Sequence, residues 1–207
     1  MSAVSSVTIA NRALQRLGAT RISSLDQNHP NARSINAMYD TTRRRLLRLY
    51  AWGFSKMRAS IAADATQTVY GELNRYPLPN NFVRLIRDPG PSPSIAGRHD
   101  WEIENGFIVT SDGSPLQFRY CGDVTNEGLF DPLFAEAFAC TMAYEACEEI
   151  TGSNEKRQLL AKDLAKIIKE ARFSNAIERD ASVPVEDDWI TAMQFDTGAA
   201  FIPGELI

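Results

Sequence analysis

Few side chains in this sequence are spaced for catalysis. The chain has two histidines, His29 and His99, and neither stands in a pattern typical of a zinc site or of a hydrolase. Paired acids occur at Glu102 and Glu104, with Asp100 just before them, and a glycosidase needs two acids that face each other across a cleft. On one strand, Glu102 and Glu104 would share a solvent-exposed face. We therefore expect no enzyme and no catalytic residues, with a glycan hydrolase that uses these acids as the alternative.

The cysteines predict no metal site. Cys121, Cys140 and Cys147 contain no CxxC spacing and have no histidines nearby in the sequence. Cys140 and Cys147 are seven residues apart and would lie on one face of a helix. We expect buried free thiols in a reducing compartment, and no metal or cofactor.

One dense basic cluster, Arg43, Arg44, Arg45 and Arg48, could contact phosphate groups of DNA. Three consecutive arginines on a helix spread over about 200° of its circumference, so they cannot form one flat patch. The chain is also acidic, with a net charge of −4. Ion pairs between subunits are therefore the favoured interpretation, ahead of transient DNA contact and of a merely solvated face.

Charge is distributed unevenly along the chain. Residues 1–60 hold ten basic and two acidic side chains, a net charge of +8, whereas residues 180–207 hold six acids and no Lys or Arg, a net charge of −6. Such a gradient suggests complementary surfaces, within a chain, between copies or with a partner. It predicts assembly that is sensitive to salt.

The composition is that of a globular protein, and it can build one core or two small subdomains. The chain has 207 residues, of which 44% are hydrophobic and 23% charged. Its longest mainly apolar run, Phe134–Tyr144, is far shorter than the ~20 residues that cross a bilayer. The first six residues lack the features of a signal peptide, and we expect none.

Two helices have clear sequence signals at both ends. The first follows Ser5, whose side chain can cap its amides, and ends at Gly18, which can adopt the left-handed conformation. Another runs from Leu133 to about Thr151, after the Asp131-Pro132 cap and before Gly152. This helix is apolar on most faces, so we expect it to be the most buried of all.

Two further helices are longer and more amphipathic. One begins near Pro30, with Asn28 or Asn31 as its cap, and has an apolar stripe that runs to about Trp52. Its opposite face carries arginines, Arg43 among them. The last spans about residues 155–179 after a cap at Ser153 or Asn154 and alternates in charge on its outer face. Its inward residues are expected to be Leu159, Leu160, Leu164, Ile167, Ile168 and Ala171.

Prolines between residues 69 and 120 exclude long helices and favour short strands. The clearest signal is the Asn105-Gly106 pair, which favours a type I′ turn between two strands of a hairpin. The proline-rich tract Asp88–Ser94 is expected to be a surface loop. The predicted strands are Phe82–Arg87, Asp100–Glu104, Phe107–Thr110 and Leu116–Tyr120.

These elements predict an α+β protein: a mainly α-helical bundle of about four helices, an inserted small antiparallel β module and an extended C-terminal arm. The expected boundaries are residues 1–62 for the first helices, 63–128 for the β module, 129–180 for the remaining helices and 181–207 for the arm. The arm is acidic but carries scattered apolar residues, so we expect it to dock on a partner or on another subunit. Trp189, Phe195 and Phe201 would be its anchors.

With these residues laid out, the sequence resembles the tail tubular protein A family of short-tailed bacteriophages, the head-to-tail adaptors or gatekeepers. The resemblance covers about residues 5–180. It rests on the order and spacing of several short motifs: Asn11–Gly18 (NRALQRLG), Ile22–Leu25 (ISSL), Tyr39 before the arginine-rich helix, Trp52–Phe54 (WGF), Tyr76–Pro79 (YPLP), Phe82–Leu85 (FVRL), Trp101–Glu104 (WEIE), Phe130–Ala137 (FDPLFAEA) and Ile150–Ser153 (ITGS).

The resemblance implies a structural virion protein of the viral tail, assembled in the host bacterial cytoplasm. Such a protein forms a ring, usually a homododecamer, that docks on the portal protein and receives the tail nozzle (tail tubular protein B-like) protein. Tail fibres or spikes attach nearby. DNA passes through the central channel at genome ejection without specific binding, and no membrane is involved.

The sequence also predicts which residues lie at the seam between the helices and the β module. Trp52, Phe54, Tyr76 and Phe82 are expected in the core there. Arg58 and Arg84 are expected instead to contact neighbouring subunits or the portal, as are Arg43, Arg44, Arg45 and Arg48 and the aromatic residues of the arm.

Overall fold

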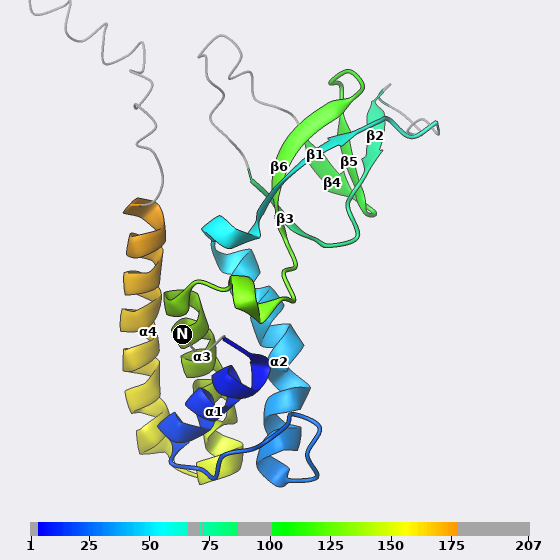
Figure 1. Cartoon of the computed structure of the whole chain (residues 1–207). Helices are drawn as coiled ribbons and strands as arrows, with labels where there is room; N and C mark the ends of the chain where they lie inside the picture. Colours follow the sequence, from blue (N-terminus) through cyan, green and yellow to red (C-terminus); the bar gives the residue numbers. More distant parts are fainter. Residues whose placement is uncertain (1–3, 66–70, 72, 87–100, 178–207) are drawn as a thin grey trace, which may run out of the picture.

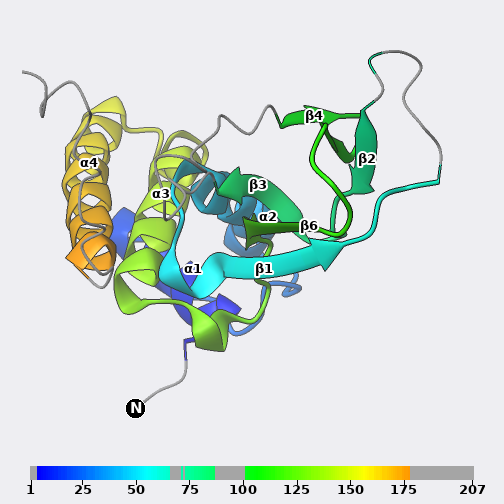
Figure 2. The same ribbon diagram turned by 90° about the horizontal axis from the view of Figure 1, so that it is seen from above.

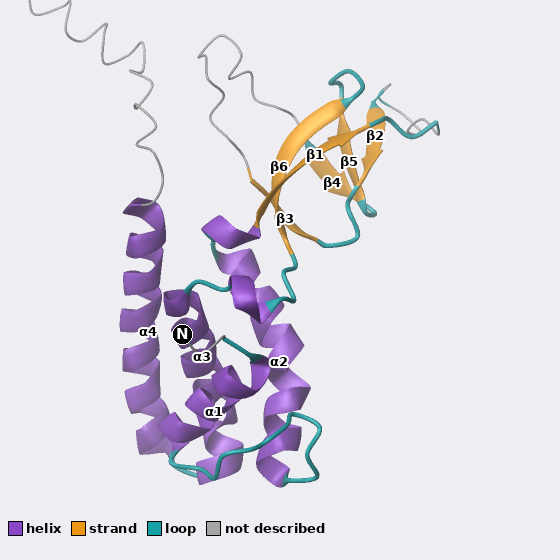
Figure 3. Ribbon diagram, viewed as in Figure 1, coloured by secondary structure: helices purple, strands orange, loops and turns teal. Residues whose placement is uncertain are grey.

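The computed structural model describes residues 4–65, 71, 73–86 and 101–177. Within them the chain is α+β, as the sequence predicts, with four α-helices and two antiparallel sheets of three strands each. The helices form an elongated bundle, and the β module sits at one end of it (Figure 1). The separation of the two parts is clearest when they are coloured by secondary structure (Figure 3).

The bundle is built around its third helix. The four helices are α1 (Ser6–Leu17), α2 (Pro30–Leu49), α3 (Pro132–Thr151) and α4 (Asn154–Ile177). Helix α3 packs against each of the other three, and its Phe134, Phe138 and Met142 are fully buried. This confirms that the helix with apolar residues on most faces is the central one.

Helices α1 and α3 begin and end as their caps predict. The Ser5 hydroxyl accepts a hydrogen bond from the Thr8 amide at 3.2 Å, and Asp131 accepts bonds from two amides of the first turn of α3. Gly18 and Gly152 end these helices at φ of 69° and 61°, in the left-handed region where glycine has no steric cost.

Helix α2 corrects two predictions. Its cap is His29, neither Asn28 nor Asn31, because the His29 Nδ1 accepts a hydrogen bond from the Asn31 amide at 3.2 Å. Arg43, expected on the exposed face, is only 5% exposed. The helix ends at Leu49, and a short 3₁₀ turn, η1 (Gly53–Ser55), follows it.

Helix α4 buries less of its apolar surface than its sequence predicts. Leu160 and Ala171 are buried, as expected, but Leu159 is 62% exposed. Phe173 and Ile177 are also exposed, at 69% and 66%. Helix α4 lies beside α3 at the edge of the bundle (Figure 2), and these three apolar side chains are left exposed there.

The β module contains six described strands: β1 (Lys56–Ile61), β2 (Asn74–Pro77), β3 (Phe82–Ile86), β4 (Glu102–Glu104), β5 (Phe107–Thr110) and β6 (Leu116–Gly122). The sequence predicts the last four of these but not β1 or β2. Asn105 and Gly106 join β4 to β5 with positive φ angles of 44° and 82°, as a type I′ turn requires. The tract Asp88–Ser94 and the start of the strand predicted at Asp100 lie outside the described residues.

The strands pair into two sheets, which we call sheet A (order β1-β6-β3) and sheet B (order β2-β5-β4). The sheets share a second hydrophobic core, to which Tyr76 and Ile108 contribute from sheet B and Phe118 and Tyr120 from sheet A. Because β1 pairs with β6 along its whole length, the module begins at Lys56, before the boundary expected at residue 63.

The seam between bundle and module is held by aromatic packing and by one amide side chain. Trp52 and Tyr76 are buried, and Phe54 and Phe82 are partly buried against the two cores, which confirms their predicted place. The Trp52 indole donates to the Leu46 carbonyl at 2.9 Å. Near the end of α4, Asn175 accepts from the Gly53 amide at 2.7 Å and donates to the Ala51 carbonyl at 3.2 Å. This clamp fixes the end of α4 beside the start of β1.

Candidate assembly surfaces

The arginine cluster of α2 binds carboxylates of the same chain. The buried Arg43 guanidinium donates to both carboxylate oxygens of Asp123, at 3.1 and 3.3 Å. Arg44 donates to the same carboxylate at 2.8 Å. Burial alone would raise the pKa of Asp123, but the hydrogen bonds and charges of Arg43 and Arg44 outweigh it and hold this pKa below its usual value.

The other two arginines of the cluster also bind within the chain. Arg45 forms an ion pair with Glu145 of α3, and Arg48 donates to the Val83 carbonyl of β3 at 2.7 Å. The cluster therefore ties α2 to α3 and to the β module. The prediction that Arg43 contacts other molecules is wrong, because its side chain is buried and hydrogen-bonded to Asp123. For the exposed Arg44, Arg45 and Arg48, a contact with another subunit stays a prediction.

A different set of cations gathers on sheet A, from three strands. Lys56 and Arg58 alternate along β1, and Arg119 of β6 lies directly opposite Arg58. Cys121 of β6 pairs with Lys56 of β1 on one side and with Arg84 of β3 on the other. Since paired residues of antiparallel strands share a face of the sheet, all four cations lie on one face. We call it the basic face: Lys56, Arg58, Arg84 and Arg119.

The basic face points away from the second core. Its opposite side carries the apolar residues Met57, Phe118, Tyr120 and Leu85, which pack toward sheet B. Arg58 is exposed, together with Ser60 and Gln117 beside it, and the other three cations are half-buried. The three strands contain no Asp or Glu at all. Cys121, which lies between Lys56 and Arg84 on this face, is fully buried, so the exposed part of the face is the part around Arg58.

The register of the basic face has an energetic consequence. Like charges directly opposite each other on neighbouring strands destabilise a sheet, and Arg58 stands opposite Arg119. The anion-binding chemistry available here is charge pairing and bidentate hydrogen bonding from guanidinium groups.

The sequence prediction identifies half of this surface. Arg58 and Arg84 are among its expected contact residues, whereas Lys56 and Arg119 are not. The missing signal is the strict alternation of polar or basic with apolar residues over Lys56–Ile61 and Gln117–Tyr120, which is the period of a strand with one buried face.

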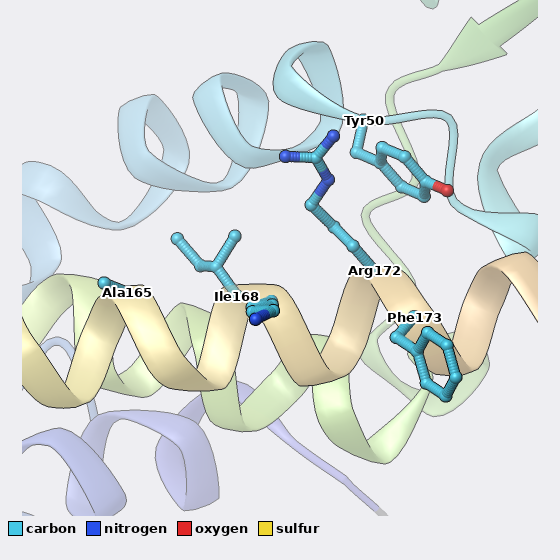
Figure 4. A pocket seen from close by; sticks show the side chains of 6 residues that line it. Tyr50, Ala165, Ile168, Arg172 and Phe173 are labelled. Atoms are coloured by element: carbon cyan, nitrogen blue, oxygen red, sulfur yellow. The ribbon is translucent and has the colours of Figure 1, made fainter.

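A hollow of about 380 Å³ lies between α4 and the end of α2. The Arg172 guanidinium lies 5.0 Å from the centre of the Tyr50 ring, a cation–π distance. Ala165, Ile168 and Phe173 also line the hollow, and the Phe173 ring points away from Tyr50 (Figure 4). Lys169 is also part of the lining, so the hollow combines apolar surface with positive charge.

The candidate catalytic residues do not converge in the part of the chain that the structure describes. Glu102 and Glu104 are exposed on β4, an edge strand of sheet B. His29 serves as the cap of α2, and Asp100 and His99 lie outside the described residues. Trp189, Phe195 and Phe201 lie outside them as well. No group of His, Cys, Asp and Glu side chains in the described ranges could hold a metal ion.

The three cysteines are free and buried, as the sequence predicts. Burial raises the pKa of the Cys140 thiol, which keeps it protonated and unreactive at neutral pH. Of the described helices, none combines the length and the apolar character that a membrane span requires.

Comparison of the chain with models of protein families and with curated protein sequences gives no match.

Proposed function

We propose that this chain is a structural subunit of a short-tailed phage tail: a head-to-tail adaptor that forms a ring, docks on the portal and joins it to the tail nozzle. It acts by assembly and has no enzymatic activity. The ring, of twelve subunits in proteins of the family that the sequence resembles, leaves a channel through which the genome leaves the virion.

The basic face is the observation that carries this proposal. Four cations share one face of sheet A, on strands without any acid, and Arg58 among them is exposed. Such a surface fits an acidic protein surface, because its three strands contain no Asp or Glu that would repel one. Arg58 and Arg84 then act as contacts to neighbouring molecules, as the sequence predicts.

The motifs behind the family resemblance support the same proposal, since several of them perform structural work. The Asn11 side chain donates to the Ile22 carbonyl and accepts from the Ile22 amide, both at 2.8 Å, and so links two of the motifs. Asp131 caps α3, and Trp52 closes the seam. Side chains with such roles are those that a protomer needs in order to keep one shape within an assembly.

The test is to mix the purified chain with portal assemblies of the same phage and image the product by electron microscopy. A closed ring of this chain on the portal is the expected result. Portals that remain bare at every protein ratio would reject the proposal. A glycan-cleavage assay on the wild-type chain and on E102Q/E104Q addresses the enzymatic alternative, and we expect no cleavage by either protein.

A further inference from the structure

We propose that the hollow between α4 and the end of α2 is the docking site for residues 186–193 of the chain's own C-terminal segment. Their sequence is EDDWITAM: three consecutive acids followed directly by Trp189 and Ile190. Trp189 then anchors the segment within its own chain, and Phe195 and Phe201 are left for contacts with other molecules. This inference goes beyond the adaptor proposal and does not depend on it.

The hollow combines apolar surface with positive charge. Its volume of about 380 Å³ lies at the lower end of the range of sites that hold small ligands. Ile168 and Phe173 line it together with the cations Lys169 and Arg172, and none of its lining residues is an acid. The side chains of Ile168 and Arg172 lie on the side of α4 that faces Tyr50 (Figure 4). A matching occupant therefore combines carboxylates with large apolar side chains.

The two cations of the hollow are available to such an occupant. Both Lys169 and Arg172 are exposed. Arg172 lies over the Tyr50 ring, and a stacked guanidinium keeps the N–H groups at its edge free for a carboxylate. The acids of the same stretch of α4, Asp163 and Glu170, pair with other cations. Within the described ranges, neither cation of the hollow forms an ion pair.

The end of α4 exposes apolar surface beside the hollow. Phe173, which is part of the lining, is 69% exposed, and Ile177, one turn further on, is 66% exposed. Residues four apart lie on the same face of a helix. Contiguous apolar surface of this kind marks a place that another group covers. Trp189, Ile190 and Met193 are the apolar side chains that the proposed occupant brings to it.

The position of the segment in the chain makes the hollow easy to reach. Helix α4 ends at Ile177, and Trp189 follows 12 residues later. Fully extended, 12 residues span about 40 Å, whereas the 12 helical residues from Ile177 back to Ala165 rise only about 18 Å. The chain can therefore reverse its direction and lie along α4. A tethered segment has an effective concentration in the millimolar range, which favours the chain's own segment over that of a second copy.

The hollow has a fixed shape. Asn175 accepts from the Gly53 amide at 2.7 Å and donates to the Ala51 carbonyl at 3.2 Å, so the end of α4 is held beside the end of α2. The Tyr50 ring packs edge-on against the buried Trp52, with 5.4 Å between the ring centroids. A preformed site requires less ordering when its occupant binds.

The test measures how well the hollow is covered, through the labelling rate of an introduced thiol. The three native cysteines are buried, so a single new cysteine is labelled selectively. A165C places it at an exposed position of the lining, and S111C places it at an exposed position just after β5. Each probe is introduced into the full-length chain and into a chain that ends at Asp180, and every protein is checked for folding by circular dichroism.

Two matched pairs of variants test the chemistry of the contact. W189A/I190A removes the apolar anchors, and F201A is its control in the same segment. K169E reverses a cation of the hollow, and K162E reverses an exposed cation of α4 that is not part of the lining. All rates are measured at two protein concentrations that differ tenfold.

We expect A165C to react at least about tenfold more slowly in the full-length chain than in the shortened one, which corresponds to a docked state populated about 90% of the time. W189A/I190A should restore fast labelling, and K169E should accelerate it by a smaller factor. F201A and K162E should react like the full-length chain. S111C should react at one rate in every background, and no rate should depend on protein concentration.

Crosslinking identifies the copy that supplies the segment. Zero-length carboxylate–amine crosslinking is applied to mixed isotope-labelled and unlabelled full-length chains. Crosslinks from residues 186–188 to Lys169 are expected within single chains, labelled or unlabelled, and not between the two kinds.

Three results would overturn the inference. The first is equal labelling of A165C in the full-length and shortened chains, and the second is slow labelling that persists in W189A/I190A. The third is protection that grows with protein concentration, with crosslinks that join labelled to unlabelled chains, which would assign the hollow to a second copy. None of these assays uses a portal, so failure of this inference and failure of the adaptor proposal are separate results.

Discussion

Two groups of arginines in this molecule have opposite relations to the fold. The arginines of the α2 cluster lie close together in the sequence, yet three of them form ion pairs with acids of the same chain. Arg43 and Arg44 bind Asp123, and Arg45 pairs with Glu145. The basic face is scattered over β1, β3 and β6, and its own strands provide no acid. Density along the sequence is therefore a poor guide to which cations share one face of the fold.

The difference follows from where the acids lie. Asp123 is 80 residues from Arg43 in the sequence, and it reaches α2 because it follows directly after β6, the central strand of sheet A. A buried charge must be paired, since an unpaired one costs several kcal/mol. The α2 cluster accordingly serves the stability of the junction between the bundle and the β module.

The largest effect expected from this comparison is the loss of stability when the Arg43 side chain is removed. Arg43→Ala leaves the Asp123 carboxylate, whose side chain is 9% exposed, without its most buried partner, and should lower the free energy of unfolding by about 3–5 kcal/mol. Urea denaturation measures this. As the matched control, Arg44→Ala removes a side chain that is 68% exposed and should cost at most about 1 kcal/mol. Equal losses for the two variants would contradict the assignment of Arg43 to the interior.

The next effect is a dependence of the free energy of unfolding on pH. Because the folded pKa of Asp123 is depressed, its contribution to stability is fully present above the unfolded pKa, about 3.9. It is lost as the pH falls through the folded pKa, because the unfolded chain takes up a proton first. The difference in unfolding free energy between the wild type and Asp123→Asn should therefore narrow below about pH 4. Urea melts from pH 7 to pH 3 test this, and a difference that stays constant with pH would argue against a depressed pKa.

The smallest effect has the opposite sign. Arg58→Gln removes one of two like charges that face each other across β1 and β6, and should raise the free energy of unfolding by about 0.2–1 kcal/mol. Lys162→Gln, on the outer side of α4, provides the control and should change little. Thermal unfolding of the two variants at low salt is the measurement. A clear destabilisation by Arg58→Gln would mean that the basic face supports the fold.

The sequence predicts the bundle well and the β module only partly, for physical reasons. Caps such as Ser5, Asp131 and Gly152 act within one helical turn, so local sequence is enough to find them. The apolar side of the alternating pattern of β1 holds the small Ala59 between Met57 and Ile61, which weakens its strand signal. Its strand conformation depends on pairing with β6, which is far away in the sequence.

The cap of α2 and the surroundings of Arg43 could not be predicted for related reasons. His29 is an uncommon capping residue, and two asparagines nearby fit the usual preference better. The helical pattern places Arg43 on the polar side of α2, but pairing with Asp123 makes burial favourable. The basic face combines residues from three strands, and a strand pairing must be known before its cations can be placed together.

Electron microscopy of portal assemblies mixed with three forms of the chain tests the central claim most directly. The forms are the wild type, K162E/K166E at two exposed positions of α4 and R58E/R119E on the basic face. The account predicts closed rings on the portal with the wild type and with K162E/K166E, and none with R58E/R119E. Rings formed equally well by R58E/R119E, or portals left bare by the wild-type chain, would contradict it.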